Sequence, residues 1–297
     1  MLDLKSSKYL SKDELREIAP SIFSTKPSPE VSSKYSHIPT DKLIDDMQLL
    51  GWNVIDAKEV KARKVDTIGY QKHLVVFRND DIVINQMPNN IRESITSPTG
   101  YRRTDGTFAK KNPIDTVFPQ ILLTNSHDGK NSFTFTAGLY RMVCENGLVI
   151  ADSKFEDFKI RHMGYDFETL RETISEMVDK LPLTVDSMNR FKNTELTKNQ
   201  KYDLARKALE TRFKIQENQK VDQVYKIDLD QFLTPVRDED KGDDLWSVFN
   251  LVQERVVTGD FDYVSGVKMR KAREIKNFKQ DLDVNKKLFA VAQEFAA

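Results

Sequence analysis

Asn125-Ser126-His127-Asp128-Gly129-Lys130 stands between two runs of alternating side chains and decides the fold that we expect. The Asp-Gly pair is typical of a tight turn, because both residue types tolerate a positive φ angle. Residues 117–124 precede the turn, and in residues 132–140 the aromatic Phe133 and Phe135 alternate with serine and threonine. Such alternation is typical of strands with two different faces. The sequence therefore predicts an antiparallel hairpin over residues 117–140.

Further elements extend from this hairpin in both directions. A helix is expected over residues 40–51, with Thr40 as its N-cap and Gly51 just after its end. Residues 73–84 are predicted to form a second hairpin. Apolar residues at helical spacing predict helices over residues 167–181, 197–213, 243–257 and 272–295. The expected fold class is α+β, with an antiparallel, hairpin-rich sheet in the N-terminal half and helices in the C-terminal half.

Three regions are expected along the chain. Residues 1–39 are predicted to be an extended leader or arm rich in proline and serine, with one short helix favoured by a capping box at residues 11–14. Residues 40–165 are predicted to be a hairpin-rich α+β core, and residues 166–297 a mainly helical region that packs on it. Such an arm can lie on a neighbouring subunit, so we expect a homo-oligomer formed through it. Residues 86–115 are predicted to be a long exposed loop.

The composition excludes some classes of protein. The 297 residues include 46 Lys+Arg and 46 Asp+Glu, so no overall basic excess favours indiscriminate nucleic-acid binding, although a local basic face is compatible with this balance. Cys144 is the single cysteine, so no disulfide can form within the chain, and a reducing, intracellular setting is expected. No apolar run approaches the roughly 18–20 residues that span a bilayer, so no membrane partner is expected.

No cofactor and no metal ion are expected from the motifs. A glycine-rich phosphate loop is absent, and the four histidines are dispersed without the spacing of metal ligands. Cys144, with His162 and Asn146 nearby, would suggest a thiol nucleophile. A small buried cysteine is the more ordinary interpretation. We therefore expect a protein without catalytic residues, while an enzyme that uses Arg141, His162 or Cys144 stays open as an alternative.

Local groups of lysine and arginine are the main candidates for a binding site. Basic side chains contact phosphates, and the neighbouring Phe261, Tyr263 and Phe278 can stack on bases. The alternative interpretation is a solvated helix face and a disordered loop, or, for Arg161, an arginine buried against a carboxylate. The residues predicted to bind nucleic acid are Arg102, Arg103, Lys110, Lys111, Arg161, Lys268, Arg270, Lys271, Arg273 and Lys276.

Three segments carry a family resemblance. They are residues 125–129, residues 141–148 with Arg161-His162, and residues 244–254 followed by the last basic group and residues 281–288. In these segments the chain resembles the phage/plasmid-like family of unknown function that bacteriophages, plasmids and prophages carry. The resemblance implies a location in the cytoplasm of a bacterial host cell. It implies no particular biochemical activity.

The leading hypothesis is a non-enzymatic nucleic-acid-binding protein of a mobile element that acts in replication or recombination. Single-strand DNA binding or annealing is its sharper form, because the order of elements resembles the core of phage and eukaryotic annealing proteins, which assemble into rings. Annealing needs no nucleotide hydrolysis, since base pairing supplies the free energy. The rival hypothesis is a structural or host-interaction protein, such as a phage counter-defence factor, which the balanced charge and the proline-rich leader favour.

Overall fold

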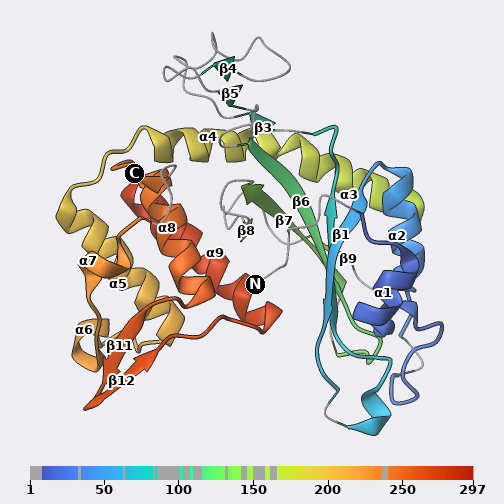
Figure 1. The fold of residues 1–297 in the computed structure, drawn as a ribbon. Coiled ribbons are helices and arrows are strands. Elements are labelled where there is room, and N and C mark those ends of the chain that lie inside the picture. Colours follow the sequence, from blue (N-terminus) through green and yellow to red (C-terminus); the bar gives the residue numbers. More distant parts are fainter. Residues whose placement is uncertain are drawn as a thin grey trace.

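The computed structural model places a sheet-containing half beside a helical half (Figure 1). The N-terminal half holds an antiparallel sheet and the C-terminal half holds most of the helices, which confirms the expected α+β class. Among the residues described, no helix combines the length and the apolar character needed to cross a bilayer. The structure describes residues 9–32, 35–62, 64–82, 84–85, 101–102, 108–109, 116–130, 133–141, 146–149, 158–160, 166–235 and 240–296.

The main sheet has seven strands, all paired in antiparallel fashion. Their order is β1-β2-β6-β7-β8, with β3 paired to β6 and β9 paired to β7, while β4 and β5 pair with each other in a separate ladder. The strands are β1 (Asn53–Glu59), β2 (His73–Arg78), β3 (Ile84–Asn85), β4 (Tyr101–Arg102), β5 (Phe108–Ala109), β6 (Thr116–Asn125), β7 (Phe133–Arg141), β8 (Asn146–Val149) and β9 (Phe158–Ile160).

The hairpin predicted around the Asp-Gly turn is confirmed, and the hairpin predicted over residues 73–84 is wrong. β6 pairs with β7 so that Leu123 lies opposite Phe135, and Gly129 in the turn has a φ angle of 69°. β2 pairs with β1 and β6, whereas β3 pairs with β6. All residues of β2 are buried, so its backbone groups need hydrogen-bonding partners at both edges, and this places the strand inside the sheet.

Helices cover both faces of the sheet. Val75 and Phe77 of β2 belong to the core that includes residues of α1 (Lys12–Ile18) and α2 (Thr40–Leu49). Leu74 and Val76 point to the opposite face, where they cluster with Phe278 at the start of α9 (Phe278–Phe295). Figure 1 accordingly draws α1 and α2 on one side of β1 and α9 on the other.

The leader packs on its own chain where the structure describes it. The capping box predicted at residues 11–14 is present and starts α1, and a 3-10 helix, η1 (Pro20–Phe23), follows. Leu15, Ala19 and Ile22 are buried in the core, so the extended conformation expected here is corrected for this segment. Their spacing of four and three residues is the spacing of one helical face. The division of the chain at residues 39 and 165 stays a prediction, as does an oligomer formed through the arm.

Three of the four histidines, which are dispersed in the sequence, lie together in space. The ring of His127 lies 4.6 Å from that of His37 and 5.2 Å from that of His73, measured between centroids. Thr40, expected to cap α2, instead places Oγ1 2.8 Å from Nε2 of His73, and the N-cap residue is Pro39. This group, in which Thr40, His73 and His127 are buried, joins the start of α2 to β2 and to the end of β6.

The hydrogen bonds around His73 define its neutral form. Nδ1 lies 3.0 Å from the carbonyl oxygen of Gln71, which can only accept, so Nδ1 carries the proton. Nε2 therefore accepts from the hydroxyl of Thr40, and Thr40 Oγ1 accepts from Nδ2 of Asn125 at 2.9 Å. Burial lowers the pKa of His73 to about 4, which agrees with a neutral ring.

Replacing Thr40 by valine is expected to lower the free energy of unfolding by about 2 kcal/mol, because it leaves the buried Nε2 of His73 without its donor and removes one of the two acceptors of Asn125 Nδ2. Thr40→Ser is the matched control, since it keeps the hydroxyl and removes only a methyl group. Denaturant unfolding of both variants measures the difference. Equal losses for the two variants would contradict the role assigned to the hydroxyl.

The helical half is built from α3 to α9. Phe191 on α4, Phe249 on α8 and Phe289 on α9 lie with ring centroids 5.4 to 6.1 Å apart at its centre. The helix predicted over residues 272–295 begins only at Phe278, because Asn277 caps it there by accepting from the backbone N–H groups of Lys279 and Gln280.

The remaining elements are η2 (Val65–Thr67), α3 (Phe167–Asp179), α4 (Leu181–Lys192), α5 (Lys198–Phe213), α6 (Val221–Val224), β10 (Tyr225–Lys226), α7 (Leu229–Phe232), α8 (Leu245–Thr258), β11 (Asp262–Ser265) and β12 (Lys268–Lys271).

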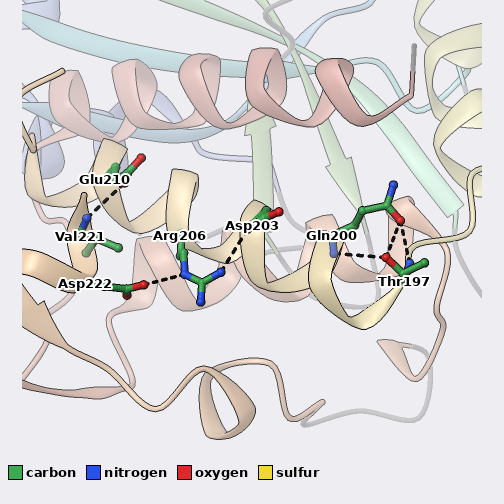
Figure 2. A network of polar contacts seen from close by, with 7 residues as sticks. All are labelled: Thr197, Gln200, Asp203, Arg206, Glu210, Val221 and Asp222. Atoms are coloured by element: carbon green, nitrogen blue, oxygen red, sulfur yellow. Dashed lines mark hydrogen bonds and ion pairs between the residues drawn. The ribbon is translucent and has the colours of Figure 1, made fainter. Parts of the chain in front are cut away.

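Polar contacts along α5 hold the segment that leads into β10 (Figure 2). Arg206 donates to Asp203 at 3.1 Å on its own helix and to Asp222 of α6 at 2.7 Å. One turn further along α5, Glu210 accepts from the backbone N–H of Val221 at 3.1 Å. These contacts fix α6, and β10 follows it directly in the chain.

Candidate nucleic-acid interface

The last predicted basic group lies on a β-hairpin. β10, β11 and β12 form a three-stranded antiparallel sheet in which Ser265 pairs with Lys268. Only Gly266 and Val267 connect these paired residues, and Gly266 has a φ angle of 62°, which suits the first position of a tight hairpin turn. The helix face considered as the alternative for residues 268–271 is therefore wrong.

Aromatic side chains anchor the base of this hairpin. The ring of Tyr263 lies 5.0 Å from that of Phe213 on α5 and 5.4 Å from that of Tyr225 on β10, and Phe261 lies 5.0 Å from Phe232 on α7. Phe261 is only 8% exposed and Phe278 only 5%, so these two rings pack in the protein and do not offer faces to nucleic-acid bases. The aromatic residues near the basic group thus hold the hairpin in place.

All four residues of β12 are exposed. Lys268 and Arg270 lie on the face of the hairpin that carries Tyr263, because paired and alternate residues share a face. Lys271 lies on the other face and forms an ion pair with Asp260 at 2.9 Å, which holds the pKa of Lys271 above its usual value.

Three of the five cations in this group form no ion pair within the part of the chain that the structure describes. They are the exposed residues Lys268, Arg270 and Arg273, whereas the exposed Lys276 interacts electrostatically with the carboxylate of Glu274. Arg273 and Lys276 follow β12 in the connection to α9. Between residues 262 and 276 the sequence has five cations and two acids, Asp262 and Glu274, so this segment is positive within a neutral chain.

Arg102, another of the predicted binding residues, does not join this surface. Arg102 lies on β4, which Figure 1 draws at the opposite end of the molecule from β11 and β12. Arg103, Lys110, Lys111 and Arg161 lie outside the described residues, as do Cys144 and His162.

Lys226, Val267 and Met269 belong to this small sheet and its turn but were not among the predicted binding residues. Lys226 on β10 and Met269 on β12 pair with Val264 from opposite sides, so Lys226, Val264 and Met269 share one face. Val267 at the tip is 97% exposed and Met269 is 75% exposed. The signal was present in residues 263–269, where Gly266 is a turn residue next to the strand-forming Tyr263 and Val264.

A shallow hollow of 440 Å³ lies beside β10 and contains three carboxylates that already have partners. Asp222 accepts from Arg206, and Asp228 accepts from the backbone N–H of Gln231. Tyr202 donates to Asp230 at 2.5 Å, and this hydrogen bond together with Lys198 lowers the pKa of Asp230. Within the described residues, no group of three histidine, cysteine or acidic side chains could hold a metal ion.

These features define an α+β protein with a two-faced antiparallel sheet, a helical half and a projecting basic hairpin. The chain belongs to the family described as "Domain of unknown function (DUF932)", which matches residues 29–289. It is similar over 291 residues to two proteins of Escherichia coli (strain K12), UPF0380 protein YafZ and UPF0380 protein YfjQ, with 25% identity to each. The match covers 98% of this chain and 93% of each relative. No solved structure matches the chain.

Proposed function

We propose that this chain is a non-enzymatic nucleic-acid-binding protein of a phage or plasmid-like mobile element, which binds single-stranded DNA through the β11–β12 hairpin during replication or recombination. The observation that supports it most is the set of exposed cations without ion partners in the described chain: Lys268, Arg270 and Arg273. Cations that keep no acidic partner are free to contact phosphates and to release counterions from the nucleic acid.

The rigidity of the hairpin supports the same proposal. Its base is held by the ring contacts of Tyr263, so the backbone that carries the cations of β12 is in place before any ligand binds. Preorganisation lowers the entropy cost of binding. In the annealing form of the proposal, the hairpin holds one strand with its bases exposed, and pairing with the second strand supplies the free energy.

The test is to remove two free cations with the double variant Lys268→Ala/Arg270→Ala. Fluorescence anisotropy with a labelled single strand should show binding weakened by about tenfold at ~50 mM salt. The slope of log affinity against log salt should become shallower by about 1.4, because each lost phosphate contact contributes about 0.7. Both positions are exposed, so the fold should be unaffected.

Lys61→Ala/Lys64→Ala is the matched control, since it removes the same charge from exposed lysines in the connection between β1 and β2. It should bind as the wild type does. Equal weakening by both double variants would show binding by overall charge and not by the hairpin. No binding of any strand by the wild type at ~50 mM salt would overturn the proposal.

A second candidate is an interaction protein that acts on a host factor. Val65 and Ile68, on and beside η2, are 86% and 60% exposed, and neighbouring exposed apolar residues favour contact with another protein. A negative result in the single-strand binding test would favour this second candidate.

A further inference from the structure

The tip of the β11–β12 hairpin is apolar and stands clear of the rest of the protein. Val267 and Met269 are 97% and 75% exposed, although both are large apolar side chains. A Cβ atom built on Gly266 would meet nothing within 4 Å, so no other part of the described chain covers the turn. Two exposed apolar side chains on a fixed, uncovered turn indicate a contact surface for something outside the protein.

Cations lie on both faces of the hairpin behind this tip. Lys268 and Arg270 occupy the face that carries Tyr263. Lys226 is the available cation of the other face, beside the Val264–Met269 pair, because Lys271 on that face is paired with Asp260 and lies opposite Asp262. Two negatively charged strands could therefore lie along the two faces while the apolar tip lies between them.

Duplex DNA offers this combination where its two strands separate. The last base pair exposes a flat, largely apolar face, and the two phosphate backbones diverge from it on opposite sides. A single strand offers one backbone and no terminal base pair. Apolar side chains inserted at base steps are a known means by which proteins contact stacked bases.

We infer that the hairpin recognises the junction between duplex and single strands, with Val267 and Met269 against the terminal base pair and the cations of the two faces on the diverging backbones. This inference rests on the proposed function. To the proposed function it adds that the preferred nucleic acid is a forked duplex end, and it names the residues that recognise this end. In annealing, such a contact would place the protein at the end of the growing duplex.

The test compares a labelled single strand with the same strand in a forked partial duplex, using anisotropy at ~50 mM salt. The wild type should bind the fork about fivefold more tightly, because partial burial of two apolar side chains adds to the phosphate contacts. The double variant Val267→Ser/Met269→Ser should bind the single strand as the wild type does and should lose the preference for the fork. Thermal unfolding should be unchanged, since both side chains are exposed.

Two results separate this inference from the proposed function. If the wild type binds the single strand but shows no preference for the fork, or if the serine variant keeps that preference, the inference is overturned and the proposed function stands. If no DNA binds, both are overturned, and the apolar tip then belongs to a contact with another protein. A 2-aminopurine base in the terminal pair gives a second measurement, because its fluorescence should change on binding of the wild type and not of the serine variant.

Discussion

Lowering the pH from 7 to 5 is expected to reduce the free energy of unfolding by about 2 kcal/mol through His73 alone. Burial lowers the pKa of His73 to about 4 in the folded protein, whereas the unfolded chain has a histidine pKa near 6.5. Above pH 6.5 the ring is neutral in both states, and its contribution to stability is fully present. Between pH 6.5 and 4 the unfolded state binds the proton and the folded state does not, so stability falls as the pH falls.

The structure explains why the folded protein resists this protonation. Nδ1 already carries a proton, which it directs at the carbonyl oxygen of Gln71. A second proton on Nε2 would face the hydroxyl of Thr40, which would have to give up its donor role and rotate. His127 lies beside the ring, and no carboxylate contacts His73 in the described residues to stabilise an imidazolium.

The measurement is urea unfolding of the wild type and of His73→Gln at intervals from pH 7 to 5. Glutamine does not titrate, so the stability difference between the two proteins should change by about 2 kcal/mol over this range, in the direction that penalises the wild type at low pH. All other titratable groups are common to both proteins, so their contributions largely cancel. A difference that stays constant with pH would exclude His73 as the titrating group.

Gly259→Ala is expected to destabilise the protein by about 3 kcal/mol or more. Gly259 ends α8 with a φ angle of 78°, and a Cβ atom there would lie 2.5 Å from the backbone carbonyl carbon and oxygen of Arg273. The connection from β12 to α9 cannot move aside easily, since Ile275 donates to the carbonyl of Val257 at 2.9 Å. Arg212 also bridges the carbonyl oxygens of Val256 and Arg273.

Gly266→Ala separates the cost of the positive φ angle from the cost of the steric clash, which together cause the loss expected for Gly259→Ala. Gly266 also has a positive φ angle, 62°, but a Cβ atom there would meet nothing within 4 Å. It should therefore carry only the backbone cost, about 1 kcal/mol. Thermal and denaturant unfolding of both variants measures the contrast. Equal losses would mean that the close approach of Arg273 to α8 is unimportant for stability.

Sequence reasoning succeeded where the determining contacts are local. The hairpin of β6 and β7 follows from one turn pair and a two-residue alternation, and the short helix α1 follows from a capping box formed by Ser11 and Glu14. Both signals lie within a few residues of the structure that they determine.

The errors arose where distant residues decide the structure. All residues of β2 are buried, so the strand shows no alternation of polar and apolar side chains and its sequence does not indicate which strands flank it. One of these neighbours, β6, lies far away in the chain. The grouping of His37, His73 and His127 likewise depends on the sheet pairing. The β11–β12 hairpin was missed because lysine and arginine are weak strand formers, and the exposed strand needs no apolar alternation.

The way the sheet is covered has a consequence for how the protein reaches its native state. Phe278 and Leu282 of α9, the last helix in chain order, pack against one apolar side of the sheet. The sheet residues on this side are Ile55, Leu74, Val76 and Leu122. As the chain is synthesised, the strands emerge from the ribosome long before this helix. Until the helix emerges, these apolar side chains of the nascent sheet are exposed to solvent. Contacts of such high sequence separation slow folding and prolong exposure to aggregation. This side of the sheet can therefore be covered only after α9 has been synthesised.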